Sequence, residues 1–456
     1  MPATDTKQAT RGISSNDRAV DEVTATLQAG ATITESKHSH LLEDEEEIEV
    51  EVELANAADA ENPLYVGVSR FEDLPLHPNL LKGVYAMGFS RPSKIQEKAL
   101  PLLLANPPRN MIGQSQSGTG KTAAFVLTML SRIDYALDQT QALCLAPSRE
   151  LASQIMRVVK AMGEYTGVKT AFAVRDTDRT IPITAQLVIG TPGTVMDLMR
   201  RKTLNIQSIN IFCLDEADNM LDQQGLGDQS IRIRSAMPKV AQILLFSATF
   251  TPEIREFATR FAPQANIISL RQEELSVANI KQFYMDCRDD THKIEVLQAI
   301  YGLMTIGQSI IFVRSRNTAD LLARRMTEEG HTVIHLHGGM SAEERDNVME
   351  DFRKGRAKVL ISTNVIARGI DVLQVTLVVN FDMPVDAKGV PDPETYLHRI
   401  GRTGRFGRSG VAINFIHDRR SYNEMLQIQN HFKREIAHIP ADDYMEVEKL
   451  LKRAIK

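Results

Sequence analysis

The segment Ser115-Gln-Ser-Gly-Thr-Gly-Lys121-Thr122 constrains the fold of this chain more than any other. An apolar run at 110–113 precedes it and a helix-forming stretch at 123–133 follows it, which is the strand, glycine-rich loop and helix of a phosphate-binding loop. The backbone N–H groups of such a loop and the N-terminus of its helix point at phosphate oxygens. Lys121 would reach the β- and γ-phosphates, and Thr122 would offer its hydroxyl to Mg²⁺. Ser115 replaces the first glycine of the strict pattern, so the segment alone also fits a glycine-rich turn into a core helix.

The composition is that of an ordinary globular protein. The 456 residues are enough for two or three domains, and the contents of 43% hydrophobic and 24% charged residues are typical of a soluble chain. Three cysteines lack metal-ligand spacing and lie too far apart for a disulfide framework, which favours a reducing, intracellular setting. No apolar run approaches about 18 residues, so no membrane span is expected. The N-terminus lacks the apolar core of a signal peptide.

The charge is distributed unevenly along the chain. Residues 1–62 hold 15 acids and 4 bases, a net of −11, so the remaining 394 residues carry +6. This first segment has no aromatic residue and is predicted to be a disordered acidic extension. Its dense acidic run at 43–53 fits a solvated, self-repelling segment, or a regulatory arm that competes with nucleic acid for a basic cleft. The body can carry a nucleic-acid surface although the whole chain is acidic.

A glutamine follows the first expected helices. Phe71 stands alone in a polar stretch, residues 80–87 have helical periodicity, and Pro92 is expected to begin a new helix that aims Gln96 in a fixed direction. A carboxamide carries a donor and an acceptor, which matches the exchangeable edge of adenine. An exposed glutamine on a helix is the simpler alternative.

Apolar runs then alternate with helical stretches, which predicts a parallel α/β sheet. The expected strands of this half are residues 142–146, 170–174, 186–190, 210–214 and 242–246. Polar groups follow these strands at the edge where ligands bind in such sheets. They are Pro147-Ser-Arg149-Glu150, Thr191-Pro192-Gly193, Asp215-Glu216-Ala-Asp218 and Ser247-Ala-Thr249.

Asp215 and Glu216 end an apolar strand 94 residues after Lys121. This is the expected place for an acid that holds Mg²⁺, and the neighbouring glutamate could take a proton from water. The same residues could instead begin an ordinary surface helix.

A second α/β half is expected at 279–456, after a polar linker at 271–278. Its expected strands are residues 308–313, 332–336, 358–362, 376–380 and 411–415. It has no second phosphate-binding loop, but Arg402 and Arg405 lie in a glycine-containing segment and are suited to fixing phosphate charge. The alternative is a pair of surface salt bridges. If ATP bound to the first half recruits these arginines, hydrolysis depends on the approach of the two halves. A nucleic acid that binds both halves is then coupled reciprocally to ATP binding.

Taken together, these motifs resemble the DEAD-box RNA helicases of superfamily 2. The resemblance covers about residues 71–420 and rests on the Gln96 segment, the phosphate loop, Asp215–Asp218, Ser247–Thr249, Ala367–Asp371 and His398–Arg405, in the order of that family. It implies an α/β protein of two tandem RecA-like parallel-sheet domains, at 63–270 and 279–456. It also implies RNA-stimulated hydrolysis of ATP with Mg²⁺ as cofactor.

The resemblance assigns roles to residues that match the motifs of the family. For ATP, they are Phe71 and Gln96 on adenine, Ser117, Gly118, Thr119, Gly120, Lys121 and Thr122 on phosphate and Mg²⁺, Asp215 as the Mg²⁺ acid through water, Glu216 as general base, Asp371 on ribose, and Arg402 and Arg405 as arginine fingers. For RNA, they are Pro147, Arg149, Thr191, Gly193, Arg314 and Thr363 on the backbone. Ser247, Thr249 and His398 match residues that couple the two activities. Such contacts read phosphates and 2′-hydroxyls rather than sequence.

Departures from the family pattern narrow the resemblance. Residues 173–178 replace a Gly-Gly loop, Thr194 stands where Arg is usual, Asn364 where Asp is usual, and 385–396 hold an insertion. The combination resembles the mRNA-export subfamily that works at the cytoplasmic side of the nuclear pore. It implies a monomer in nucleus and cytoplasm, a nucleoporin partner and an activator that carries inositol hexakisphosphate.

Three functions are compatible with the motifs. The first is an RNA-dependent ATPase that unwinds RNA locally or strips proteins from it. The second is an ATP-gated RNA clamp with slow turnover, which would use the same residues. The third, a metabolic phosphotransferase, is disfavoured by Arg402 and Arg405.

Overall fold

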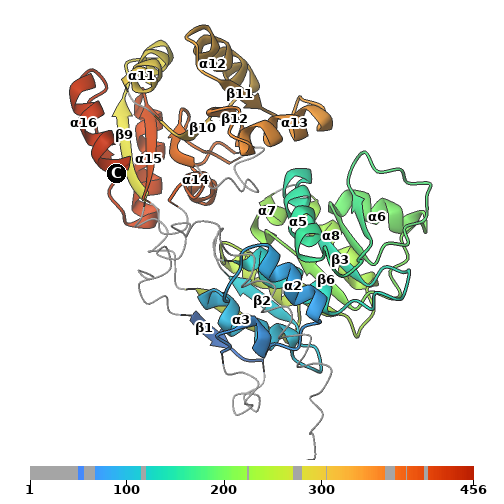
Figure 1. Cartoon of the computed structure of the whole chain (residues 1–456). Coiled ribbons are helices and arrows are strands. Elements are labelled where there is room, and N and C mark those ends of the chain that lie inside the picture. The colour runs from blue at the N-terminus through green and yellow to red at the C-terminus, as the bar shows by residue number, and fades with distance from the viewer. Residues whose placement is uncertain are drawn as a thin grey trace, which may run out of the picture. The chain divides into compact units, whose positions relative to one another are not determined.

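The computed structural model describes residues 50–55, 67–114, 120–222, 225–270, 280–303, 306–364, 375–386, 388–404 and 409–455 (Figure 1). The predicted disorder of residues 1–49 and 56–62 and the predicted linker at 271–278 lie outside these ranges. None of the helices in the described ranges has the length and apolar character needed to cross a bilayer.

The first sheet has the strand order β1-β8-β2-β7-β6-β3-β5-β4. All of its paired strands run parallel except β1, which is antiparallel to β8. The strands are β1 (Val50–Glu53), β2 (Met111–Gln114), β3 (Ala142–Leu145), β4 (Thr170–Ala173), β5 (Leu187–Gly190), β6 (Ile211–Leu214), β7 (Gln242–Ser247) and β8 (Asn266–Leu270). The five strands predicted for this half are confirmed as β3 to β7, whereas β8 was not predicted.

Helices cover both faces of this sheet because its strands are apolar on both sides. Along β3, Ala142 and Cys144 belong to one core cluster, while Leu143 and Leu145 belong to the other. The first cluster is closed by α2 (Pro78–Ala86), α3 (Lys94–Leu104), α4 (Lys121–Ser131) and α5 (Arg149–Met162), with the short helix η4 (Phe71–Asp73). The second is closed by α6 (Pro192–Arg200), α7 (Ala217–Asp222), α8 (Leu226–Ala236) and α9 (Pro252–Phe261).

The second sheet is parallel throughout, with the order β11-β12-β10-β13-β14-β9-β15. Its strands are β9 (Ile280–Asp286), β10 (Gln308–Phe312), β11 (Val333–Leu336), β12 (Val359–Ser362), β13 (Val375–Asn380), β14 (Gly410–Ile416) and β15 (Ala437–His438). The strands predicted for this half are confirmed as β10 to β14, and β9 and β15 were missed. Two α/β sheet domains of the predicted class are therefore present.

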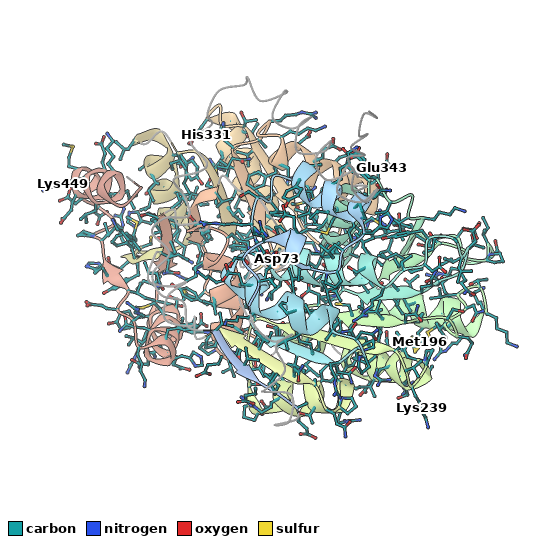
Figure 2. All side chains as sticks on the ribbon, turned by 60° about the horizontal axis from the view of Figure 1, so that its bottom comes forward. Asp73, Met196, Lys239, His331, Glu343 and Lys449 are labelled. Carbon is teal, nitrogen blue, oxygen red and sulfur yellow. The ribbon has the colours of Figure 1, made fainter. Side chains whose placement is uncertain are left out.

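Helices also cover both faces of the second sheet. One face packs against α11 (Asp290–Leu303), α12 (Arg316–Glu328) and α16 (Tyr444–Ile455). The other packs against α13 (Ala342–Arg353), α14 (Pro393–Ile400) and α15 (Arg419–Phe432). Charged side chains such as Lys239, before β7, and Lys449, on α16, lie exposed outside these cores (Figure 2).

The end of the acidic run is ordered, so the prediction of disorder throughout residues 1–62 is wrong for Val50–Glu53. This strand alternates valine and glutamate, and Val50 and the following Leu54 pack against the first core while both glutamates stay exposed. The backbone N–H of Ala55 donates to Asn266 Oδ1 at 3.0 Å. Val52, on the same face, is 37% exposed, so Val50, Leu54 and the edge pairing with β8 hold this strand in place.

Candidate functional site

Polar residues of the first domain gather where three adjacent strands end. Gly120 and Lys121 follow β2, Asp215 and Glu216 follow β6, and Ser247 is the last residue of β7. Because β2, β7 and β6 are neighbours and parallel, their carboxyl ends meet at one edge of the sheet. The structure therefore brings Gly120 and Lys121, at the end of the predicted phosphate loop, and the predicted acids to one edge of the sheet.

Gln96 is tied to the end of the phosphate loop. Its Nε2 donates to the carbonyl oxygen of Gly120 at 3.0 Å, and its Oε1 accepts from the backbone N–H of Ser93 at 3.0 Å. Ser93 is the N-cap of α3, so a capping box sets the direction of Gln96. The expectation that a helix begins at Pro92 is wrong, because α3 begins at Lys94.

Gly120 is required by its backbone and by its neighbour. It is the N-cap of α4 with a φ of +98°, in the left-handed region. A Cβ at this position would lie 2.7 Å from Gln96 Nε2. The predicted phosphate-binding residues Ser117, Gly118 and Thr119 lie outside the described residues.

Phe71 and Gln96 line the same small hollow, together with Ala123 and Ala124 of α4. The two residues expected at adenine are thus close to one another and to the phosphate loop. Phe71 is only 2% exposed and packs within the first core, so its ring is held by α2, α3 and α4.

Lys121 is half-buried at the start of α4, directly before the half-buried Thr122. Burial lowers the pKa of Lys121, the charges of Asp215, Asp218 and Glu216 oppose this shift, and the charge of Arg402 adds to it. A lysine at the start of α4, directly after the phosphate loop, is suited to pairing with phosphate oxygens.

Asp215 is buried, and burial raises its pKa to about 6. The charge of Lys121 and the backbone N–H of Glu216 act against this rise, and the charge of Asp218 adds to it. The carboxylate is therefore short of neutralising charge. A carboxylate and the Thr122 hydroxyl are the hard oxygen donors that Mg²⁺ prefers, so these residues fit that cation.

Glu216 adopts an unusual backbone conformation, with a φ of +51°. Its N–H donates to Asp215 Oδ1 at 3.0 Å, and its Oε2 accepts from Asn219 Nδ2 at 3.3 Å. Left-handed conformations of residues other than glycine are costly and cluster at functional sites.

Asp218 is the centre of a buried network that was not predicted in this form. Its backbone N–H donates to Ser247 Oγ at 3.2 Å. Its Oδ2 accepts from the N–H groups of Ala248 and Thr249, both at 3.2 Å, and from Thr249 Oγ1 at 3.3 Å. His398 Nε2 lies 3.5 Å from the same oxygen. One carboxylate thus joins the three residues predicted to couple the two activities: Ser247, Thr249 and His398.

Arg402 is also buried, at 3% exposure, and its Nε donates to the carbonyl oxygen of His398 at 2.9 Å. The backbone of His398 therefore positions this arginine. The other predicted residues of this group, Arg405 and Asp371, lie outside the described residues.

The RNA candidates of the first domain lie after β3 and β5. Pro147 is buried, and Arg149 begins α5, where its Nη1 and Nη2 lie 2.7 Å and 2.8 Å from carboxylate oxygens of Asp176 and Asp346. Thr191 is the N-cap of α6, and Gly193 is exposed in its first turn. RNA that binds Arg149 through phosphate has to replace these carboxylates.

The RNA candidates of the second domain share a cavity. Arg314 and Thr363 line a space of about 230 Å³. Asn364, Met383, Val385 and Arg399 complete its lining. Arg314 Nη2 also lies 3.3 Å from Glu424 Oε2, so this arginine has one carboxylate partner.

Arg399 was missed as a candidate although it is the largest of the fully buried side chains. Its guanidinium donates to Asn364 Oδ1, to Asn380 Oδ1 at 2.9 Å and to the backbone oxygen of Asp382 at 2.8 Å, all of which are neutral acceptors. Burial lowers its pKa, but an arginine stays charged at neutral pH. The usable signal in the sequence was Asn364, the neutral residue where the family usually has Asp.

Comparison with known proteins gives consistent matches. Residues 93–257 match the family described as DEAD/DEAH box helicase, and residues 292–407 match the helicase conserved C-terminal domain. The chain is 63% identical over 400 residues to ATP-dependent RNA helicase dbp5 of Schizosaccharomyces pombe, covering 88% of this chain and 79% of that one. It is 60% identical over 400 residues to ATP-dependent RNA helicase DBP5 of Mycosarcoma maydis, covering 88% of each.

Solved structures agree with these matches. The structure of S. cerevisiae Dbp5 bound to RNA and ADP BeF3 has 56% identity and a TM-score of 0.81, covering 85% of this chain and all of that one. A substituted S. cerevisiae dbp5 bound to nup159, a gle1 variant, ip6 and adp has 54% identity and a TM-score of 0.61, covering 83% of this chain and 99% of that one.

Proposed function

The chain belongs to the DEAD-box ATP-dependent RNA helicases, within their mRNA-export subfamily, and we propose how its own residues carry out that activity. The observation that carries the proposal is the group of buried acids, Asp215, Glu216 and Asp218, that faces Lys121 at the edge of the first sheet. Such a site can hold ATP and activate water, and through Asp218 it connects both steps to His398 and Arg402 of the second domain.

ATP is held by the residues between β2 and α4 and by those of α3. Lys121 and the backbone N–H groups of 117–122 bind the phosphates, and Gln96 reads adenine beside Phe71. The amide of Gln96 keeps one free hydrogen on Nε2 and one lone pair on Oε1 beyond its two bonds to the protein, which is enough for one edge of adenine. Asp371 contacts the ribose.

Hydrolysis is assisted by Glu216. As water attacks the γ-phosphorus and the bond to the ADP oxygen breaks, the Glu216 carboxylate accepts the proton that the water loses. Asp215, through water, and Thr122 would hold Mg²⁺, which supplies positive charge to the phosphate oxygens when bound. Arg402 and Arg405 stabilise the negative charge of the transferred phosphoryl group.

Asp218 couples hydrolysis to RNA. It is two residues from Glu216, and it holds Ser247 and Thr249 on one side and His398 on the other. His398 in turn holds Arg402 through its backbone. A shift of any member of this network therefore moves the arginine relative to the acids, which makes ATP and RNA binding reciprocal.

RNA is bound through its backbone. Arg149 and Arg314 supply positive charge, and Thr363 supplies a hydroxyl. We assign Pro147, Thr191 and Gly193 to the same surface. These groups contact phosphates and sugars, so binding does not depend on the base sequence. The resulting activity is local unwinding of RNA or remodelling of RNA–protein complexes.

The relatives support a proposal for the place of action. A relative that is 54% identical over most of this chain is bound to nup159, a gle1 variant and ip6. We assign to this chain the corresponding partners, a nucleoporin and an activator that carries inositol hexakisphosphate, at the cytoplasmic face of the nuclear pore. The chain itself acts as a monomer that passes between nucleus and cytoplasm.

Steady-state ATP hydrolysis with and without single-stranded RNA, at low and moderate salt, tests the proposal. We expect strong stimulation by RNA that weakens as salt rises, since phosphate contacts release counterions. Equal rates with and without RNA would contradict the coupling. Tight, ATP-dependent RNA binding with hardly any stimulation would instead identify an ATP-gated clamp.

A further inference from the structure

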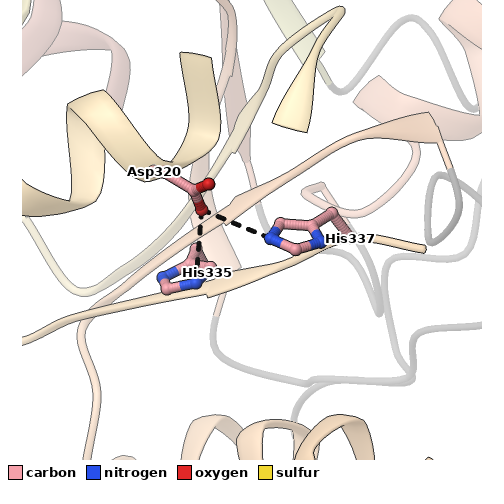
Figure 3. Close-up of side chains that lie close together, drawn as sticks. All are labelled: Asp320, His335 and His337. Atoms are coloured by element: carbon pink, nitrogen blue, oxygen red, sulfur yellow. Dashed lines mark hydrogen bonds and ion pairs between the residues drawn. The ribbon is translucent and has the colours of Figure 1, made fainter. Parts of the chain in front are cut away.

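Two histidines and an aspartate of the second domain form a cluster that the ATPase mechanism does not use. Figure 3 shows the side chains of Asp320, His335 and His337 turned toward one another, with Asp320 between the two rings. Asp320 lies on α12, His335 on β11, and His337 directly after that strand.

The sequence places these side chains together for simple reasons. His335 and His337 are two residues apart along an extended segment, so they lie on one face, and the fully buried Leu336 between them points into the opposite core. Helix α12 packs over β11 and brings Asp320 to the histidine face. The cluster therefore joins a helix to the edge strand of the sheet.

The separations suit a tetrahedral cation. Asp320 Oδ1 lies 3.5 Å from His335 Nε2 and 3.3 Å from His337 Nε2. The three ligand atoms all lie within 4.8 Å of one another. Ligand bonds of about 2.0–2.1 Å in a tetrahedral zinc site place neighbouring ligand atoms about 3.3 Å apart. Two of the three edges are already close to this value, and the third is at most 4.8 Å.

The cluster is accessible from solvent. The side chains of His335 and Asp320 are 39% and 44% exposed, whereas that of His337 is 13% exposed. A cation could enter without unfolding the domain, and water would fill the remaining coordination position.

We propose that Asp320, His335 and His337 bind a borderline transition-metal cation of the Zn²⁺ class and thereby clip α12 to β11. Two imidazoles and one carboxylate favour Zn²⁺, Co²⁺, Ni²⁺ or Cu²⁺. Mg²⁺ prefers oxygen ligands and keeps several bound waters. We therefore do not expect Mg²⁺, the cation of the ATP site, to occupy this cluster.

Binding has a structural consequence at the loop after β11. In this structure His337 Nδ1 accepts from the backbone N–H of Gly339 at 3.2 Å, so a neutral ring carries its proton on Nε2. A cation on Nε2 takes the place of that proton, and the proton of the neutral ring then lies on Nδ1. The hydrogen bond to Gly339 is lost, and the loop before Ser341, the N-cap of α13, is released.

Zn²⁺ titration of the tag-free, metal-free full chain, without nucleotide, tests the site. Calorimetry is expected to give about one strong site, and Asp320→Asn and His335→Gln are each expected to weaken it on the order of tenfold or more. Zn²⁺ is also expected to raise the melting temperature of the native chain and not of these variants, because a ligand of the folded state stabilises it. Both substitutions are at partly exposed positions, and circular dichroism checks that the variants fold.

His331→Gln is the matched control. His331 precedes the same strand, is labelled in Figure 2 and pairs with Glu329 rather than with the cluster, so its loss should leave Zn²⁺ affinity unchanged. Equal affinity in all four proteins, or full competition by Mg²⁺, would overturn the assignment. Amide hydrogen exchange at 337–341 is expected to increase on Zn²⁺ binding, and unchanged exchange would refute the release of the loop.

Discussion

The two sheet domains share one architecture but bury charges of opposite sign. Among the described residues, the buried charged side chains of the first domain are all acids: Glu150, Asp215, Glu216 and Asp218. Those of the second domain are three bases, Lys293, Arg399 and Arg402, and one acid, Glu424. Two histidines are buried in this domain as well. Because a buried charge is costly without a partner, the acids of the first domain require cations, such as Lys121 and Mg²⁺, and the bases of the second require anions, such as phosphate. The fold is common to both, and the difference in function lies in the side chains at the strand ends.

The partners of the buried charges sharpen this difference. Lys293 lies 3.1 Å from Asp290 and 3.6 Å from Asp382, so its charge is neutralised within the second domain. Arg399 has hydrogen bonds to neutral oxygens instead. Lys293 is paired directly with carboxylates, whereas the charges of Asp382 and Asp392 act on Arg399 from a distance and its hydrogen bonds go to neutral oxygens, so Arg399 can still meet an anion in the adjoining cavity.

The largest expected effect concerns a base of the second domain. Arg402→Ala should lower RNA-stimulated ATP turnover on the order of 10³-fold or more, because an arginine that stabilises the transferring phosphate contributes that much. Single-turnover hydrolysis measures it. Arg356→Ala is the control, since this exposed arginine pairs with Asp351 at the surface. A rate near that of the native chain would remove Arg402 from the mechanism.

The matching change in the first domain is Glu216→Gln. It removes the proton acceptor but keeps the shape, so hydrolysis should fall about 10²- to 10⁴-fold while ATP and RNA still bind. Filter binding and single-turnover hydrolysis separate the two quantities. Glu253→Gln, at an exposed position on α9, should change neither. Normal turnover in Glu216→Gln would refute the general-base role.

Asn364→Asp tests whether RNA binding by the second domain depends on the positive charge of Arg399. A carboxylate beside Arg399 should lower RNA affinity about tenfold and reduce the salt slope of binding by about 1, since one cationic contact is neutralised. The melting temperature should not fall, because the buried arginine gains a counter-charge. Fluorescence anisotropy at several salt concentrations measures the affinity. Asn205→Asp adds the same charge at an exposed turn, and we expect it to leave RNA affinity and its salt dependence unchanged.

Asp215 gives the first domain a pH dependence of its own. Its pKa rises from an ordinary value of 3.8 to about 6, so the folded chain holds a proton on this group between about pH 4 and 6. Asp215 has to be ionised to hold Mg²⁺, so ATP turnover should fall several-fold as the pH drops through about 6. Because Mg²⁺ competes with the proton, a higher Mg²⁺ concentration should move this fall to lower pH. Without ligands, the same group should make unfolding easier as pH rises from about 4 to 6, because the folded state binds the extra proton. A midpoint that does not move with Mg²⁺ would contradict the role of Asp215.

The sequence was sufficient for the parts that depend on local pattern. Continuous apolar runs located β3 to β7 and β10 to β14, and the spacing of motifs located Lys121, Asp215 and Glu216 at one edge. The strands β8 and β9 were missed because polar residues interrupt their apolar runs after two or three residues: β8 reads Asn-Ile-Ile-Ser-Leu and β9 reads Ile-Lys-Gln-Phe-Tyr-Met-Asp. The role of Asp218 as a centre depends on contacts with residues about 30 positions away, which no local pattern encodes. The roles of the site residues remain predictions that the substitutions above test.

The smallest expected effect concerns β1, which the sequence concealed inside an acidic run. Deleting residues 1–62 removes this strand and uncovers the edge of β8, whereas deleting 1–49 leaves Val50–Glu53 in place. The longer deletion should lower the free energy of unfolding by about 1 kcal/mol relative to the shorter one. This corresponds to a melting temperature that is about 2–4 °C lower. Basal ATPase should rise equally in both if the acidic charges before β1 inhibit the enzyme. Equal melting temperatures would mean that β1 adds nothing to stability, and unchanged ATPase would leave the acidic segment as a solvated extension.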